Sequence, residues 1–182
     1  MVSQTTQNTT ANVADESAIR NIPMRMIEAW NKGSGEAFAE KFTDTADFIA
    51  FEGTHLKGRQ EIAAFHQRIF DTAMKGSKLE GDVIFVRFLS PQLAIMHSVA
   101  MTTLSGQTSS SPGRDSIQIF VVVKSNEGWR VEGLLNARKL TIERQLFLDD
   151  FDSLVTKDQR QVIDFTAALR QRQISKSAKS PG

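Results

Sequence analysis

The sequence of 182 residues is long enough for one domain of ordinary size with extensions at its ends. Its 22 basic and 21 acidic residues give a net charge of +1, which argues against a nucleic-acid-binding protein because such proteins carry a clear basic excess. It has no cysteine, which excludes disulfides, thiolate metal sites and cysteine nucleophiles. No apolar run approaches the roughly 20 residues of a membrane helix, and the polar first residues lack the features of a signal peptide. We therefore expect a cytoplasmic protein.

The N-terminal third of the chain predicts helices. Residues 1–14 are polar and of low complexity, so we expect disorder there. The segment 15–31 has apolar residues three and four positions apart, which predicts a helix. Pro23 either kinks this helix or restricts it to a start near Asn21, because an interior proline removes a hydrogen bond. A short second helix follows over residues 36–42.

A strand pair and a third helix come next. Residues 47–51 are rich in phenylalanine and isoleucine and predict a strand. Gly53 interrupts it, and residues 54–57 form a short return strand. Gly58 opens a helix whose apolar stripe includes His66.

The second half of the chain is mainly β. Short turns separate its strands, which indicates an antiparallel meander. Helices first and strands after point to an α+β fold. Residues 139–172 return to helical spacing, and residues 173–182 are expected to form a flexible tail. The predicted strands are 79–88, 93–104, 115–124 and 129–138.

Several short stretches of the sequence are specific in combination. They are Trp30-Asn31-Lys32-Gly33, Ala46-Asp47-Phe48-Ile49 with Gly53, Leu56-Lys57-Gly58-Arg59 with Glu61-Ile62, His66, Ala94-Ile95-Met96-His97, Asp115-Ser116-Ile117-Gln118, Trp129-Arg130-Val131 and Asn136. In these stretches the sequence resembles the SnoaL-like branch of the nuclear transport factor 2-like superfamily, and within it the SgcJ/EcaC-type family. The resemblance covers residues 15–138 and leaves the helices of 139–172 outside, where they either cover the pocket or extend a dimer.

The resemblance implies a cone-shaped fold, with three N-terminal helices packed on a curved, mainly antiparallel sheet around a pocket. It also implies a homodimer formed through the outer face of the sheet. The sequence favours a dimer independently, because Ile117, Ile119 and Val121 alternate with Phe120 and Val122. Both faces of this strand are therefore apolar, and the face away from the helices needs a partner chain or the C-terminal helices to cover it.

Fold does not decide function in this superfamily, which includes isomerases, cyclases, dehydratases and assembly proteins. We expect a pocket protein that binds a small, partly apolar metabolite, with cofactor-free acid–base chemistry if it is an enzyme. The alternative is a non-catalytic dimerisation, assembly or carrier domain with an empty or vestigial pocket. No cofactor is expected, because Gly33-Ser34-Gly35 follows a helix and lacks the third glycine of a dinucleotide site.

Glu52, His66 and His97 are the candidate catalytic residues. In the similar ketosteroid isomerase the base is an aspartate, whose position corresponds here to Ala50, so Glu52 is the substitute carboxylate if the strand alternation continues. His66 and His97 are candidate acids or oxyanion donors. A buried histidine with one hydrogen bond is the structural alternative for His66. The histidines share no spacing typical of metal ligands, so no metal is expected.

The remaining candidates are expected to line the pocket. The two tryptophans are equally compatible with packing in the core, and the asparagine either orients a ligand or caps a strand end. The predicted lining residues are Trp30, Phe48, Ala50, Trp129 and Asn136.

Overall fold

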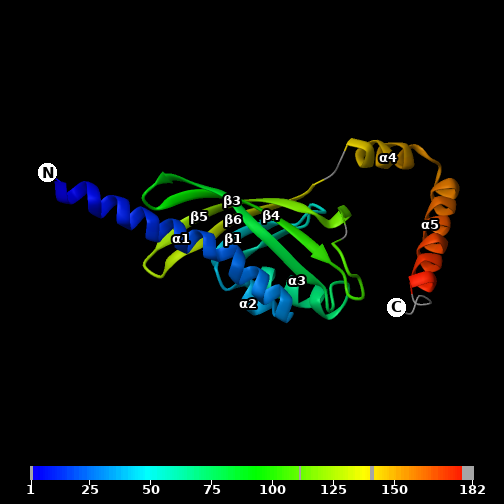
Figure 1. Ribbon diagram of the computed structural model, residues 1–182, viewed down its shortest axis with the longest axis horizontal. Helices are drawn as coiled ribbons and strands as arrows, with labels where there is room; N and C mark the ends of the chain where they lie inside the picture. The colour runs from blue at the N-terminus through cyan, green and yellow to red at the C-terminus, as the bar shows by residue number, and fades with distance from the viewer. Residues whose placement is uncertain (1, 111, 140–141, 178–182) are drawn as a thin grey trace. The chain divides into compact units, whose positions relative to one another are not determined.

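The computed structural model describes residues 2–110, 112–139 and 142–177. The chain divides into two compact units, residues 1–139 and 140–182. In the first unit, three helices lie against a six-stranded sheet (Figure 1). The helices are α1 (Val2–Lys32), α2 (Gly35–Ala39) and α3 (Gly58–Asp71), and η1 (Pro112–Arg114) is a short 3-10 turn. The strands are β1 (Phe42–Ile49), β2 (His55–Lys57), β3 (Lys78–Ser90), β4 (Leu93–Thr103), β5 (Ser116–Ser125) and β6 (Gly128–Arg138).

The sheet has the strand order β2-β1-β6-β5-β4-β3. Strands β3 to β6 form the antiparallel meander that their short turns predict. β1 pairs with β2 in antiparallel fashion and with β6 in parallel fashion. The predicted α+β class with a mainly antiparallel sheet is therefore confirmed.

Helix α1 is longer than the sequence predicts. It starts at Val2, inside the segment for which the composition predicts disorder, and it continues through Pro23. An interior proline costs about 3 kcal/mol. The neighbouring Ile19, Ile22 and Met26 are all buried, and each buried side chain of this kind contributes about 1.5–3 kcal/mol. Packing of the apolar face against the sheet therefore offsets the cost of the proline.

Glycine and serine end α1 and start α2. Gly33 has a φ of 70°, and the amides of Gly33 and Ser34 donate to the carbonyls of Trp30 and Ala29, which is the Schellman arrangement of a helix C-terminus. The Ser34 hydroxyl then accepts from the Ala37 amide at 3.2 Å and caps α2. This tight reversal brings α2 onto α3.

The second helix ends earlier than predicted. Its sequence pattern extends to Phe42, but α2 ends at Ala39 and Phe42 is the first residue of β1. Phe42 pairs with Val131 of β6, and the Val131 amide donates to the Lys41 carbonyl at 2.8 Å. The apolar side chain of Phe42 is buried in either conformation, so its hydrophobicity alone cannot distinguish the end of a helix from the start of a strand.

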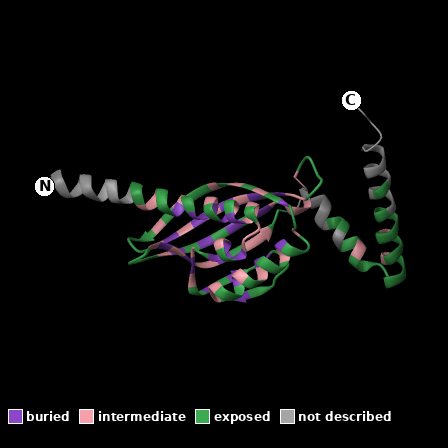
Figure 2. Cartoon of the chain, turned by 90° about the horizontal axis from the view of Figure 1, so that it is seen from below, coloured by how far each residue is buried: buried purple, intermediate pink, exposed green. Residues whose placement is uncertain are grey.

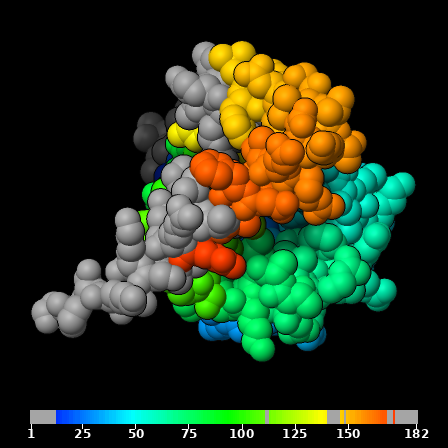
Figure 3. All heavy atoms as spheres, turned by 90° about the vertical axis from the view of Figure 1, so that its right-hand side faces the viewer, coloured from blue at the N-terminus to red at the C-terminus, as the bar shows by residue number. Residues whose placement is uncertain are grey.

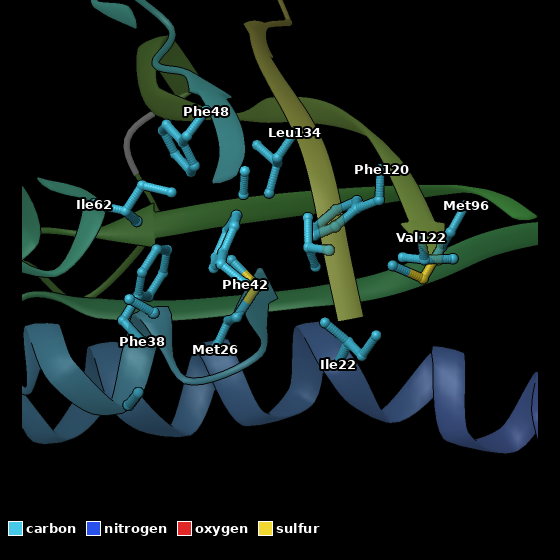
Figure 4. Packing of buried hydrophobic residues seen from close by; sticks show 14 of the residues in the cluster. Ile22, Met26, Phe38, Phe42, Phe48, Ile62, Met96, Phe120, Val122 and Leu134 are labelled. Carbon is cyan, nitrogen blue, oxygen red and sulfur yellow. The ribbon is translucent and has the colours of Figure 1, made fainter. Parts of the chain in front are cut away.

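One hydrophobic core fills the space between the helices and the sheet (Figure 4). Phe38, Phe42 and Phe48 meet there through ring contacts with centroid distances of 6.0–6.5 Å. The buried residues of α1 lie on the side that faces the sheet (Figure 2). The core therefore holds α1, α2 and β1 in fixed positions on one face of the sheet.

Asp15 connects α1 to the far end of the sheet. Its carboxylate accepts from the Trp129 Nε1–H at 2.9 Å and from Lys124 Nζ at 2.8 Å. These two hydrogen bonds, that from Lys124 first, lower the pKa of the Asp15 carboxyl. The Trp129 ring is buried, so its N–H depends on Asp15 for a hydrogen-bond acceptor.

We expect Asp15→Ala to lower the free energy of unfolding at pH 7 by about 1–2 kcal/mol, because it leaves the buried indole N–H without an acceptor. Asp15→Asn keeps an acceptor for Trp129 and is expected to cost less. Urea unfolding of the two variants and the wild type measures the difference. Equal stability of the two variants would show that the indole hydrogen bond contributes nothing.

The second unit consists of α4 (Ile142–Ser153) and α5 (Thr156–Ser177), drawn in yellow to red in Figure 3. Gln159 Nε2 of α5 donates to the Phe151 carbonyl of α4 at 3.2 Å. Several apolar side chains of this unit are exposed, including Leu146, Phe147 and Phe165. Helix α5 continues to Ser177, and residues 178–182 of the expected tail lie outside the described residues.

Candidate functional site

Inward-facing side chains of β4, β5 and β6 form three rows across the sheet, on the face that carries the helices. Each row contains one residue from each strand in register, and successive rows are about 7 Å apart because inward residues alternate along a strand. The rows change from apolar to polar to cationic in one direction. They are Met96–Phe120–Leu134, Ser98–Gln118–Asn136 and Ala100–Ser116–Arg138.

All of these row residues except Met96 line a cavity of about 100 Å³, together with side chains of the facing helices. Drug-sized ligands occupy pockets of about 300–1,000 Å³, whereas an engineered cavity of about 150 Å³ holds benzene. The space therefore corresponds to a molecule of roughly one ring, and a multi-ring ligand needs side chains to move.

Aromatic rings form the apolar end of the cavity. The rings of Phe38 and His66 are stacked, with centroids 3.9 Å apart. Phe48 meets His66 edge-on at 5.2 Å, and its pairing with Leu134 joins β1 to the apolar row. Trp30 also lines the cavity, and its Nε1–H donates to the Ser77 hydroxyl at 3.0 Å. This hydrogen bond fixes the indole ring at the cavity wall.

His66 is the buried titratable side chain of the cavity, with 3 % of its surface exposed. Its Nδ1 lies 2.8 Å from the Ile62 carbonyl, and because a carbonyl only accepts, Nδ1 carries the proton. Burial lowers the pKa of His66 to about 4, while the hydrogen bond to Ile62 acts in the opposite direction. The imidazole is therefore neutral at pH 7, and its Nε2 lone pair has no hydrogen-bond donor among the described residues.

The middle row is a hydrogen-bonded chain centred on Gln118. The Ser98 hydroxyl donates to Gln118 Oε1 at 2.6 Å. Gln118 Nε2 donates to the Ser116 hydroxyl at 2.7 Å and to Asn136 Oδ1 at 3.4 Å. Both amide hydrogens of Gln118 are used in this way, and its orientation is fixed from three sides.

Charged side chains line the other end of the cavity. Arg114 and Arg138 both contribute to the lining. The Arg138 guanidinium lies over the Phe51 ring, 4.2 Å from its centre, and Arg114 contacts the Met74 sulfur at 3.9 Å. Asp82 of β3 is exposed and lies at the same cavity. The cavity thus has an aromatic end and a polar end with two cations and one carboxylate.

Four of the residues that the sequence indicates line this cavity together: Trp30, Phe48, His66 and Asn136. Two others are buried elsewhere. Ala50 lies in the turn after β1, where its carbonyl accepts from the Gly53 amide. Trp129 packs against Phe88 and binds Asp15. The expected placement of Ala50 and Trp129 in the cavity lining therefore differs from the structure.

Glu52 and His97 do not line the cavity either. β1 ends at Ile49 and residues 50–54 form a turn, so strand alternation no longer applies at Glu52, which is exposed. His97 alternates with the inward residues Met96 and Ser98 and faces the other side of the sheet, where its ring lies 4.2 Å from that of Phe85. Because both faces of β4 carry apolar residues, the sequence alone does not show on which face His97 lies.

Asn136 is the one residue of the polar row that was predicted from the sequence; Ser98, Gln118, Ser116 and the two arginines were not predicted. The sequence does indicate Gln118, because this polar residue lies on the same face of β5 as Phe120 and Val122. A polar side chain on a buried phase requires hydrogen-bond partners. Ser98, Ser116 and Arg114 carry no such signal, because only the pairing of β4, β5 and β6 brings them together.

Within the described part of the chain, no group of three histidine or acidic side chains is arranged to hold a metal ion. Over the same residues, no helix combines the length and the apolar character needed to cross a membrane.

Known structures with the same architecture place the chain in a family. A domain of unknown function with a cystatin-like fold from Nostoc punctiforme is 63% identical, with a TM-score of 0.81, and the match covers 87% of this chain and 98% of that one. The chain belongs to the same family as this domain, and it has the cystatin-like fold that nuclear transport factor 2-like proteins share.

Two more distant solved structures have the same fold. An NTF2-like protein with a cystatin-like fold from Novosphingobium aromaticivorans has a TM-score of 0.62 at 20% identity, over 78% of this chain and 94% of that one. An NTF2-like protein of unknown function from Shewanella oneidensis has a TM-score of 0.56 at 16% identity, over 66% and 97%. No family model and no curated protein matches the chain.

Proposed function

We propose that the protein binds a small, partly apolar molecule in the cavity between α1, α3 and the sheet. The observation that carries the proposal is the combination of polar groups with unused hydrogen-bonding capacity and an aromatic wall around one space. A cavity that only reflected imperfect packing would be lined by apolar side chains. Here Gln118, Ser116 and Asn136 lie side by side at its wall.

Binding is the function that the geometry supports best, and acid–base chemistry depends on one residue. His66 Nε2 faces no protein donor among the described residues, so it can accept a proton or a hydrogen bond from a ligand. Its pKa of about 4 makes it a weak base at pH 7. If the protein is an enzyme, we expect His66 to assist a substrate that is already acidic, without a cofactor.

The test is native mass spectrometry of the full chain purified from its own source, followed by denaturing release of bound molecules. We expect a released molecule with one ring or a similar volume. The Ser98→Leu variant, which fills the cavity at its polar row, should carry much less of it. A wild-type protein that is empty in repeated preparations, or an equal load on Ser98→Leu, would contradict the proposal.

A second proposal concerns self-association through the outer face of the sheet. Ile117, Ile119 and Val121 of β5 are exposed there, next to Leu135 of β6. Exposed apolar side chains in a continuous patch are typical of interaction surfaces, and a second copy of the chain is the partner that symmetry favours. The same native mass spectrum tests the homodimer: a purely monomeric mass at micromolar concentration would contradict it.

A further inference from the structure

The polar end of the cavity offers hydrogen-bond donors. Gln118 donates its two amide hydrogens to Ser116 and Asn136, whose oxygens accept them. The hydroxyl hydrogen of Ser116 and the Nδ2 hydrogens of Asn136 therefore remain for another acceptor, since neither has one among the described residues. Arg138, in the same row as Ser116, carries a guanidinium, which donates hydrogen bonds and never accepts them.

Positive charge lies at the same end. Ser116 is paired with Arg138 across β5 and β6, and Arg114 precedes Ser116 by two residues and lines the cavity. Arg114 is partly buried and has no carboxylate partner within the described residues. Asp82 is the one acidic side chain of the described lining, and it is exposed to solvent, which screens its charge.

Aromatic surface lies at the opposite end. Phe48 and the stacked Phe38–His66 pair present rings to the space inside the apolar row. Rings prefer offset-stacked or edge-on neighbours at 4.5–7 Å. The row of Gln118 and Asn136 lies about 7 Å from the apolar row, which is about the full length of one ring with a carboxylate substituent.

From this arrangement we infer that the ligand is a small planar carboxylate, with its ring against Phe38 and His66 and its carboxylate held by Asn136, Ser116 and Arg114. This inference rests on the proposed binding function and names its ligand class. A carboxylate is acceptor-only and matches the hydrogens that Ser116, Asn136 and the Arg114 guanidinium have available to donate. A guanidinium binds its two oxygens with particular geometric fit. The cavity volume of about 100 Å³ restricts the rest of the molecule to about one ring.

Calorimetric titration of the full chain with benzoate and with benzamide tests the inference, because the two probes have nearly the same shape and differ in charge. We expect benzoate to bind with a dissociation constant on the order of 1 mM or tighter and benzamide to bind at least about tenfold more weakly. Arg114→Met should weaken benzoate about 10- to 100-fold, the usual range for losing a charged hydrogen bond. Asn136→Asp, which changes one donor into an acceptor, should abolish benzoate binding and spare benzamide.

Arg87→Met is the matched control, because Arg87 is exposed on β3 and does not line the cavity; it should leave benzoate binding unchanged. Circular dichroism confirms that each variant is folded. Benzamide binding as tightly as benzoate would overturn the carboxylate inference while leaving the binding function intact. Equal losses in Arg114→Met and Arg87→Met would place the anion elsewhere and overturn it too. Failure of both probes to bind would overturn both proposals.

Discussion

Replacing Phe42 by alanine should lower the free energy of unfolding by about 3–5 kcal/mol, the range for removing a buried phenylalanine. Phe42 has 0 % of its surface exposed. Its ring contacts those of Phe38 and Phe48 at 6.4 and 6.0 Å, so it joins α2 to β1 at the centre of the core. The backbone around it is held by pairing with β6, which limits how far the structure can close around the space left behind.

Denaturant unfolding monitored by tryptophan fluorescence measures this effect. Ile84→Ala is the control, because Ile84 is also in the sheet but is 52% exposed, and we expect it to cost less than about 1 kcal/mol. A loss below 1 kcal/mol for Phe42→Ala would mean that Phe42 does not lie where the structure has it. The slope of the unfolding curve must stay constant for the comparison to hold.

The second large effect is a pH dependence of stability that His66 causes. In the folded protein, burial lowers the pKa of His66 from 6.5 to about 4. Between these two values the unfolded chain binds a proton that the folded chain does not, so stability falls as the pH decreases. The contribution is complete above about pH 6.5 and is lost progressively toward pH 4, to a total of roughly 3 kcal/mol.

The measurement is the free energy of unfolding at several pH values from 4 to 7.5, for wild type and His66→Gln. We expect the wild type to lose stability across this window and His66→Gln to have a shallower slope, whatever its stability at pH 7.5. His97→Gln removes a histidine from the other face of the sheet and is the control for the loss of one imidazole. Parallel curves for wild type and His66→Gln would show that His66 is not buried as a neutral group.

Much of the fold follows from local sequence pattern. The apolar spacing after Gly58 predicts α3, and the turns at residues 90–92 and 125–128 predict the meander of β3 to β6. These patterns act over a few residues, so they can be recognised without tertiary contacts. The predictions that differ from the structure depend on contacts distant in sequence: the start of β1 at Phe42 depends on β6, and the continuation of α1 through Pro23 depends on burial against the sheet.

The residues of the candidate site also divide into those that local sequence predicts and those that depend on distant contacts. His66 and Phe48 were predictable, because each lies on an apolar phase of its own element. Glu52 was expected to share a face with Ala50, but β1 ends at Ile49 and the turn that follows leaves Glu52 outside the cavity lining. Nothing in the local sequence determines whether the strand ends before or after Ala50. The donors at Ser116 and Asn136 become a site only through the register of β5 on β6, which a single sequence does not specify when both faces of the strand are apolar.

Methyl NMR of the methionines shows directly whether a small molecule enters the cavity. Met26 and Met74 line the cavity, whereas Met101 is exposed and does not. During titration of the full chain with benzoate or benzyl alcohol, we expect the methyl signals of Met26 and Met74 to shift and saturate together while that of Met101 stays in place. Shifts at Met101 alone, or no saturable shift at Met26 and Met74 with either probe, would mean that neither molecule enters the cavity.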